Sequence, residues 1–355
     1  FGRLFRDSGC KGPILLEPEG KSTAPAVFAA AHHVIQHKGD ALLLVMPSDH
    51  HIPDHKAFID MVLAGDAAAR GGAIVTFGVT PDRLETGYGY IELGNAASGA
   101  AYAVRKFHEK PDEATAQRML DAGHYVWNAG IFLFRASAML ALGKAFEAEM
   151  LAAVQAAMHA ARKDKNFWHI DKAAWGKIQG QSVDYAILEK TDQIACVRFS
   201  GAWSDLGDWN AVAGQLPHDG EGNFLTGTAS QIDCQNTTLW SASDGTQLVG
   251  LGLENIVTVV MDDAVLVADA ARMQDVRDVV EHLETAGISQ AHQHAKDYRP
   301  WGWFESLVNQ PGYQVKRLHL YPGAALSLQS HQHRSEHWVV VSGTASVVRD
   351  DEILT

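Results

Sequence analysis

Two aspartates in the sequence each follow a stretch that is typical of a buried strand. Asp49 comes after Ser48, just beyond the apolar run 41–46, and Asp205 lies a few residues beyond the run 194–199. In an open α/β sheet, ligands bind beyond the carboxyl ends of the strands. Magnesium that is shared with phosphates needs only one or two protein carboxylates. An aspartate in such a position also commonly forms a turn or caps a helix, so the magnesium interpretation needs matching chemistry elsewhere.

Further segments carry residues that suit sugars and phosphates. Glu109 can accept hydrogen bonds from sugar hydroxyls, and Lys110 can place a point charge on a phosphate, although a solvated charge pair is the plain alternative. Gly89, in E-T-G-Y-G-Y, permits close backbone approach to a ligand, and W-N-A-G at 127–130 is expected to be a turn before a strand. Carboxylates, a lysine and glycine turns are what nucleotidyl transfer needs, because the protein there mainly positions groups and neutralises charge.

The segment E-P-E-G-K-S-T-A-P at 17–25 leaves a strand and enters a helix. Its Gly20 and the free amides of the helix N-terminus could bind an anion or a purine edge. Many strand-to-helix turns share this pattern, so on its own it does not identify a nucleotide site.

The elements that hold these residues alternate along the chain. Residues 14–210 pass between buried apolar runs and amphipathic stretches, the pattern of a Rossmann-like, doubly wound α/β domain. The run 41–46 has no polar alternation, so we expect it to be buried on both faces of a parallel sheet. We expect strands at 14–16, 41–46, 73–79, 102–107, 131–134 and 194–199, and helices at 24–37, 56–70, 113–122, 137–162 and 183–190.

After about residue 220 the pattern changes to short apolar runs separated by polar residues and glycine. Such short rungs favour a small β-helix-like or stacked-strand domain, closed by a helix at 274–286. A polar linker follows, and the alternating runs at 314–320 and 337–341 then indicate a small all-β barrel. We therefore expect domains at 1–219, 220–288 and 298–355, with the linker at 289–297.

Composition restricts the partners and the compartment. The net charge of −13 over 355 residues argues against a nucleic-acid or anionic membrane surface. Cys10, Cys196 and Cys234 are far apart, which suits a reducing cytoplasm. No apolar run approaches the roughly 18 residues that span a bilayer, and no signal peptide is visible. Because the chain opens at Phe1 and stops within strand-like sequence, we expect it to be truncated at both ends.

Seven motifs give the sequence a specific resemblance: E-P-E-G-K-S-T-A-P-A, M-P-S-D-H, E-T-G-Y-G-Y-I, F-H-E-K-P-D, W-N-A-G-I-F, S-V-D-Y-A-I-L-E-K-T and W-S-D-L-G-D-W. Their order and approximate spacing resemble those of bacterial mannose-1-phosphate guanylyltransferases of the long type, which end in a mannose-6-phosphate isomerase domain. The resemblance runs through almost the whole chain. It implies a cytoplasmic enzyme of polysaccharide biosynthesis that converts GTP and mannose 1-phosphate into GDP-mannose and pyrophosphate.

The same resemblance implies roles for individual residues. It places magnesium on Asp49 and Asp205, the sugar phosphate on Lys110, and the substrates on Gly20, Lys21, Thr23, Ser48, Gly89, Glu109 and Asn128, with Gly20 to Thr23 near guanine and Gly89, Glu109 and Asn128 around mannose. A sugar phosphate oxygen would attack the α-phosphorus in line, without a covalent intermediate, while cations stabilise the transition state.

Three departures from the family pattern keep alternatives open. The usual G-R-N-T is Gly20-Lys-Ser-Thr23 here, W-N-S-G is W-N-A-G, and the glycine-rich opening loop with its catalytic Arg and Lys is absent. The enzyme could therefore use another base or sugar. A non-catalytic nucleotide-sugar-binding regulatory subunit is the second alternative, and a homo-oligomer is also open.

The segment that begins at Gly323 resembles the first motif of the cupins. Counting from that glycine, the motif selects Gln329, His331 and Glu336 as metal ligands, with His333 as the competitor. Such a mixed set suits zinc or another first-row divalent ion. In isomerase chemistry the metal polarises the sugar carbonyl while a base moves a proton. The later strands of an isomerase barrel lie beyond Thr355, so we expect an incomplete cupin-like barrel, weak or no metal binding, and no isomerase activity.

Overall fold

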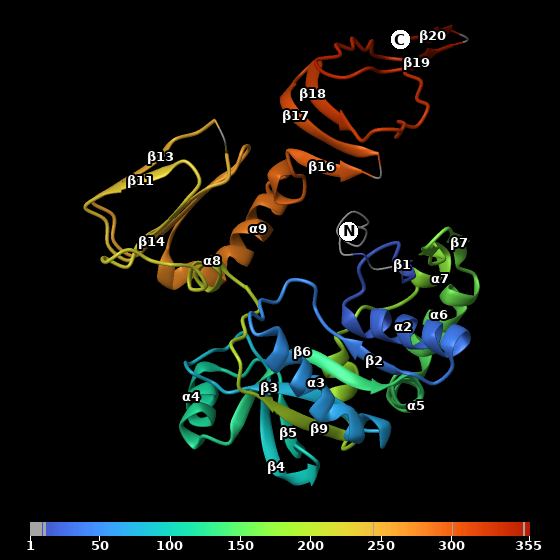
Figure 1. Cartoon of the computed structure of the whole chain (residues 1–355), viewed down its shortest axis with the longest axis vertical. Helices are drawn as coiled ribbons and strands as arrows, with labels where there is room; N and C mark the ends of the chain where they lie inside the picture. Colours follow the sequence, from blue (N-terminus) through green and yellow to red (C-terminus); the bar gives the residue numbers. More distant parts are fainter. Residues whose placement is uncertain (1–8, 10–11, 244, 300, 351) are drawn as a thin grey trace. The chain divides into compact units, whose positions relative to one another are not determined.

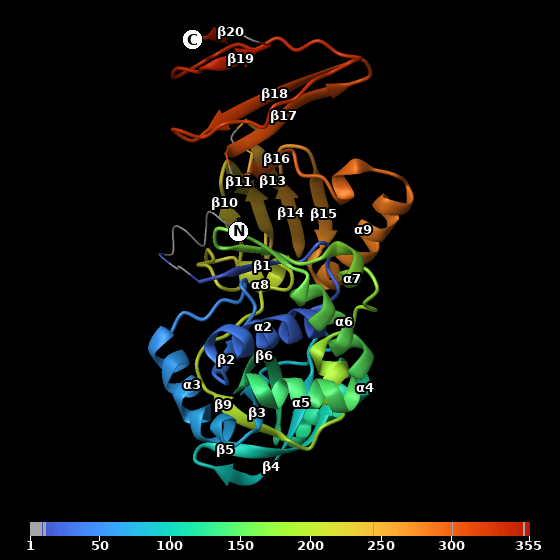
Figure 2. The same cartoon turned by 90° about the vertical axis from the view of Figure 1, so that its right-hand side faces the viewer.

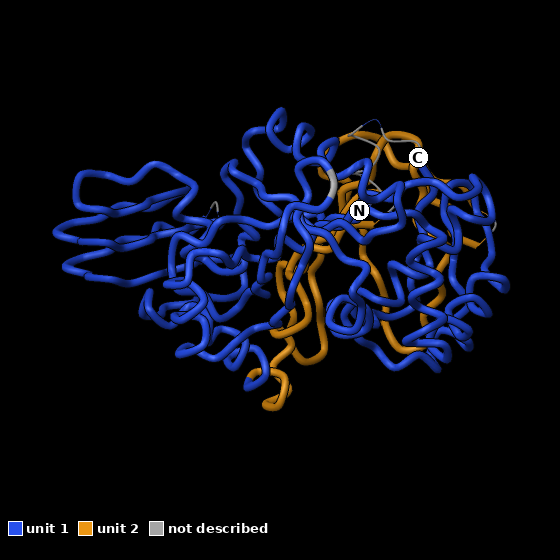
Figure 3. Tube along the Cα trace, turned by 90° about the horizontal axis from the view of Figure 1, so that it is seen from below, with its two compact units in different colours: residues 1–282 blue, residues 283–355 orange. Residues whose placement is uncertain are grey.

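The computed structural model describes residues 9, 12–243, 245–299, 301–350 and 352–355, so Cys10 and Pro300 lie outside the described residues. The chain divides into two compact units, residues 1–282 and residues 283–355 (Figure 3). Every helix among the described residues falls short of the length and apolarity that crossing a lipid bilayer requires.

Unit 1 is built around a mixed sheet (Figure 1). Among its described residues the strand order is β2-β6-β3-β9-β5-β4. β3 and β9 run parallel, whereas β6 is antiparallel to both β2 and β3, and β5 is antiparallel to both β9 and β4. The bounds are Leu42–Val45 for β2, Ile74–Val79 for β3, Tyr90–Ser98 for β4, Ala101–His108 for β5, Tyr125–Arg135 for β6 and Ile194–Phe199 for β9.

Helices cover this sheet and enclose two apolar clusters. Phe28, Met139 and Val154 bring α2, α5 and α6 together in one cluster, and Figure 2 shows these helices grouped. Met61 of α3 packs with Phe77 of β3 in the other cluster. The helical elements up to residue 213, of which α7 packs on α6 and α8 on the later 3₁₀-helix η2 (Ala270–Asp275), are α2 (Thr23–Lys38), α3 (His55–Arg70), α4 (Glu113–Ala122), α5 (Ala136–Phe146), α6 (Ala148–His159), α7 (Lys172–Trp175), the π-helix η1 (Asp184–Leu188) and α8 (Trp209–Ala213).

The prediction of a parallel, fully buried strand at 41–46 is wrong in two respects. β2 pairs antiparallel with β6, and it lies at the edge of the described strands, where Leu44 is 38% exposed. The lack of polar alternation did indicate two covered faces, since Leu43 and Leu42 pack against the two different apolar clusters. An apolar run therefore indicates contact on both faces but not the direction of its neighbour.

Other predicted elements also differ. The strand at 14–16 (β1, Ile14–Leu16) joins β8 (Phe167–His169) and β7 (Arg162–Asp164) outside the main sheet. The helix expected at 137–162 is broken at Glu147, whose φ of −137° is not helical, and the helix expected at 183–190 is the π-helix η1. W-N-A-G is not a turn before a strand, because it lies inside β6. There residues 129–131 form a bulge opposite Phe77, and Gly130 has a φ of +66°.

The rest of unit 1 is a stack of short strands. β10, β12 and β14 run parallel, β15 adds antiparallel to β14, and β11 pairs parallel with β13. The 3₁₀-helix η2 follows, and the single helix expected at 274–286 is confirmed as α9. The bounds are Phe224–Thr226 for β10, Ala229–Ile232 for β11, Thr238–Ser241 for β12, Leu248–Leu251 for β13, Ile256–Val260 for β14, Val265–Asp269 for β15, Ala270–Asp275 for η2 and Val276–Thr285 for α9.

Unit 2 is antiparallel β-structure. β17 pairs with both β16 and β18, and β19 pairs with β20. The expected linker contains a 3₁₀ turn and the start of β16. The strand expected at 337–341 does not form, since no described strand pairs with it and Val341 is 92% exposed. The bounds are Ser289–Ala291 for η3, Lys296–Arg299 for β16, Gly302–Gln310 for β17, Tyr313–Leu320 for β18, Val347–Arg349 for β19 and Glu352–Leu354 for β20.

Candidate active site

A backbone bridge joins the two loops that carry the predicted magnesium ligands. The His51 amide donates to the Ser204 carbonyl at 2.8 Å, and the Ser204 amide donates to the His51 carbonyl at 3.1 Å. Asp49 lies two residues before this bridge and Asp205 one residue after it. Burial lowers the pKa of His50. The negative charges of the Asp49 and Asp205 carboxylates act in the opposite direction and offset part of this effect. The two acids, distant in sequence, are therefore near enough to one imidazole for both charges to act on it.

These two aspartates suit magnesium better than a closed metal site. Ser48 and Asp49 are exposed, and the Asp49 carboxylate accepts no hydrogen bond from the described residues. Nor do those residues contain a cluster of three or more His, Cys, Asp or Glu side chains that could hold a metal ion. Magnesium keeps several waters and takes only one or two carboxylates alongside phosphates. The donor set at Asp49 and Asp205 therefore fits that ion.

The predicted sugar-binding residues come together just before β4, just after β5 and inside β6. The backbone amide of Asn128 donates a hydrogen bond to the Gly89 carbonyl at 2.8 Å. A Cβ on Gly89 would lie only 2.8 Å from Oε2 of Glu109, so this carboxylate packs directly on the glycine. Lys110 Nζ lies 3.8 Å from Oε1 of Glu109 and is half exposed. These contacts place an acceptor, Glu109, and a cation, Lys110, side by side, whereas Gly89 is buried beneath Glu109 and Phe107 and is not open to a ligand as the sequence predicts.

Asp184 belongs to this group, although we did not single it out from the sequence. It receives a hydrogen bond from Nδ2 of Asn128 at 3.1 Å, while Oδ1 of Asn128 accepts from the Thr76 hydroxyl and the Gly130 amide. Burial raises the pKa of Asp184. The only sequence signal was its place in the S-V-D-Y motif, since it follows no strand end. Its position at the start of a π-helix is typical of functional sites.

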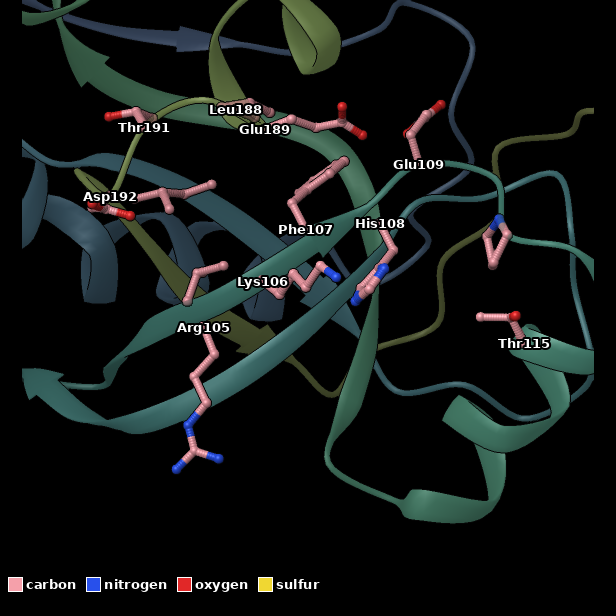
Figure 4. A pocket seen from close by; sticks show the side chains of 13 residues that line it. Arg105, Lys106, Phe107, His108, Glu109, Thr115, Leu188, Glu189, Thr191 and Asp192 are labelled. Carbon is pink, nitrogen blue, oxygen red and sulfur yellow. The ribbon is translucent and has the colours of Figure 1, made fainter.

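Glu109 is held in a setting that favours its protonated form. Burial, and next the negative charge of Asp184, raise the pKa of Glu109 to about 7. A cavity of about 500 Å³ adjoins this carboxyl group. Figure 4 shows that β5 contributes Lys106 and His108, α4 contributes Thr115, and the segment after η1 contributes Glu189. The cavity is polar and carries both charge signs, which suits a hydroxyl-rich ligand with an anionic group.

The turn predicted to face the nucleotide is fixed by the segment before η1. The Thr23 hydroxyl accepts a hydrogen bond from the Val183 amide at 2.8 Å, so that group is already engaged. Lys21 pairs with Glu19 at 2.9 Å. Gly20 is open, because a Cβ there would meet nothing within 4 Å. Val183 adjoins Asp184, and this connects the turn to the sugar-binding group.

The metal ligands predicted in unit 2 do not form a metal site. His331 Nε2 and Glu336 Oε1 lie 2.9 Å apart, but Arg334 lies 3.0 Å from both atoms. Gln329 and His333 make no polar contact with the described residues. A guanidinium between two ligands repels a cation. This arrangement therefore does not fit zinc.

The Rossmann-like sheet, with Asp49 and Asp205 in joined loops beyond its strands, places the chain in the nucleotidyltransferase class. The family profile described as Nucleotidyl transferase matches residues 3–219, and the one described as Mannose-6-phosphate isomerase C-terminal matches residues 286–355. A solved structure described as mannose-1-phosphate geranyltransferase from Thermus thermophilus is similar with a TM-score of 0.68 and 29% identity. The match covers 79% of this chain and 81% of that one.

Curated relatives narrow the class to a family. "Xanthan biosynthesis protein XanB" from Xanthomonas campestris pv. campestris (strain B100) is 47% identical, over 96% of this chain and 72% of the relative. "Mannose-1-phosphate guanylyltransferase" from Escherichia coli (strain K12) is 40% identical over the same shares. The chain belongs to the family of mannose-1-phosphate guanylyltransferases that carry a mannose-6-phosphate isomerase C-terminal domain.

Proposed function

We propose that the chain transfers GMP from GTP to mannose 1-phosphate, releasing pyrophosphate, in a magnesium-dependent reaction at the Asp49–Asp205 site. The observation that supports this proposal is the His51–Ser204 backbone bridge, which joins the loops of the two aspartates in a chain of this family. When bound, magnesium would neutralise phosphate charge and stabilise the charge that develops in the transition state.

The side chains divide the remaining work. Asp49 and Asp205 hold the cation where the α-phosphate is attacked, and Lys110 directs the sugar phosphate by its charge. Glu109 and Asn128 receive the mannose hydroxyls, and Gly89 leaves the space that the Glu109 carboxylate occupies. The turn at Gly20, Lys21 and Thr23, together with Ser48, faces the nucleotide. Catalysis by positioning and charge neutralisation needs no covalent enzyme intermediate.

The finer domain plan forms part of the same proposal. Residues 1–219 carry out nucleotidyl transfer, 220–288 form a β-helix-like domain, and 298–355 are isomerase sequence with a cupin-like fold. Parallel stacking of β10, β12 and β14 supports the β-helix-like assignment. A reaction that consumes GTP suits a cytoplasmic enzyme, and the xanthan relative suggests that the GDP-mannose supplies polysaccharide synthesis.

A substrate panel tests this function. Pyrophosphate release should require both GTP and mannose 1-phosphate, and should be much slower with ATP, UTP or glucose 1-phosphate. Because Lys21 and Ser22 replace the family's usual Arg and Asn, preference for another base is the specific alternative. Binding of GDP-mannose without any pyrophosphate release would instead support a regulatory subunit.

A further inference from the structure

The carboxylate of Asp205 uses its two oxygens differently. Oδ1 accepts two hydrogen bonds, one from the Tyr88 hydroxyl at 2.7 Å and one from the Gly207 amide at 3.1 Å. Oδ2 accepts no hydrogen bond from the described residues. A carboxylate with one oxygen engaged and the other open is oriented to offer the open oxygen to a ligand.

The loop around Asp205 is shaped for this orientation. Leu206 has a φ of +50°, a strained conformation for a branched side chain. A Cβ on Gly207 would lie 2.7 Å from Oδ2, so a larger residue would cover the open oxygen. The Ser204 hydroxyl accepts a hydrogen bond from the Leu206 amide at 3.1 Å. The strained backbone of Leu206, the glycine at 207 and the hydrogen bond to Ser204 together fix the position of the Asp205 carboxylate.

Tyr88 reaches Asp205 from a distant part of the sequence and is itself held firmly. Its ring meets Trp127 and Trp203 edge to face, with centroids 5.2 and 5.4 Å apart. The preceding turn is closed by Glu85, which accepts hydrogen bonds from the Gly87 amide and from Gln274. Since a phenol is protonated at neutral pH, the Tyr88 hydroxyl is a fixed donor to Asp205.

We propose that Tyr88 is a positioning residue for nucleotidyl transfer, which holds Oδ1 of Asp205 so that Oδ2 faces the divalent cation. The proposal rests on the proposed function for the identity of the cation site. Partners that orient a metal ligand typically contribute 10- to 100-fold to metal affinity or activity. Tyr88 does not itself touch the metal or the reacting atoms in this role.

The test compares Tyr88→Phe with Tyr90→Phe in the full chain. Tyr90 offers a matched control, because its hydroxyl also makes a hydrogen bond, to the Glu85 carbonyl at 2.9 Å, but does not reach Asp205. Binding of Mn²⁺ is followed by the EPR signal of the free ion, with GDP-mannose present, so the readout does not depend on turnover. We expect Tyr88→Phe to weaken Mn²⁺ binding about tenfold or more, and Tyr90→Phe to change it less than about twofold.

Turnover provides the second measurement. In Tyr88→Phe the magnesium concentration for half-maximal rate should rise, while KM for mannose 1-phosphate at saturating magnesium stays the same. Unchanged Mn²⁺ binding in Tyr88→Phe, equal losses in both variants, or no Mn²⁺ binding by the parent chain would each overturn the proposal. Normal Mn²⁺ binding by a parent chain that releases no pyrophosphate would defeat the proposed function and leave the role of Tyr88 standing.

Discussion

Glu109 is the residue whose protonation should control sugar binding. Its pKa is raised to about 7, so it is mostly neutral below about pH 6 and mostly ionised above about pH 8. The carboxylate is the better acceptor for sugar hydroxyls. KM for mannose 1-phosphate should therefore fall several-fold as the pH rises through 7, which steady-state kinetics from pH 6 to 8 will show.

The Glu109→Gln variant isolates this effect from titration of the substrate phosphate. Glutamine carries no negative charge, so KM of the variant should be higher than that of the parent chain. Because glutamine does not titrate, KM of the variant should also lack the part of its pH dependence that is due to Glu109. The ratio of the two KM values at each pH cancels the contribution of the substrate. A constant ratio across pH 6 to 8 would show that Glu109 does not titrate in the sugar site.

For individual site residues, the sequence predicts a functional role where the residue follows a strand or belongs to a motif. Asp49 and Asp205 both follow apolar runs, and the His51–Ser204 backbone bridge joins the two loops that carry them. Tyr88 and Asp184 were not selected. A tyrosine between glycines and an aspartate on a helix have no periodic signal, and their importance comes from contacts more than 50 residues away in sequence.

The pairing of β3 with β6 fixes the position of Asn128 in the proposed sugar site. Gly78 of β3 lies opposite Asn128, and a Cβ there would approach Val126 Cγ2 to 2.3 Å and Cys196 Sγ to 2.8 Å. Gly78→Ala should therefore lower the free energy of unfolding by about 1–3 kcal/mol through overpacking. The urea midpoint of Gly78→Ala, compared with that of the parent chain, measures this loss.

Gly245→Ala is the matched control, since a Cβ at that position meets nothing within 4 Å. Its stability should stay within about 0.5 kcal/mol of the parent chain. Equal stability of the two variants would mean that β3 and β6 can separate at Gly78 without cost, and that the bulge does not fix Asn128.

Element types were more predictable than their pairing. The bounds of α4 and β9 agree with the pattern in the sequence, because amphipathic spacing and an apolar run are local properties. The antiparallel insertion of β6, the bulge at 129–131 and the break at Glu147 were not foreseen. They depend on which strand or helix packs alongside, and a local pattern does not contain that information.

At the scale of the whole molecule, the two units should differ in activity. Arg334 lies between His331 and Glu336, and the apolar residues at 339–341 are exposed. We expect no conversion of mannose 6-phosphate to fructose 6-phosphate by this chain, and only weak zinc binding. Calorimetry with zinc measures the binding directly. Tight uptake of one equivalent of zinc would contradict the prediction that zinc binds only weakly.

Asp49 and Asp205 are expected to act on one cation. Rates of pyrophosphate release from GTP and mannose 1-phosphate should be compared for Asp49→Asn, Asp205→Asn and the double variant. Each single change should lower kcat by about 10²–10³-fold or more with the fold retained, and the double variant should be no slower than the worse single, because groups that act as a unit are not additive. A double variant whose loss of kcat equals the product of the two single losses would contradict a shared cation. Near-normal turnover in either single variant would contradict it as well.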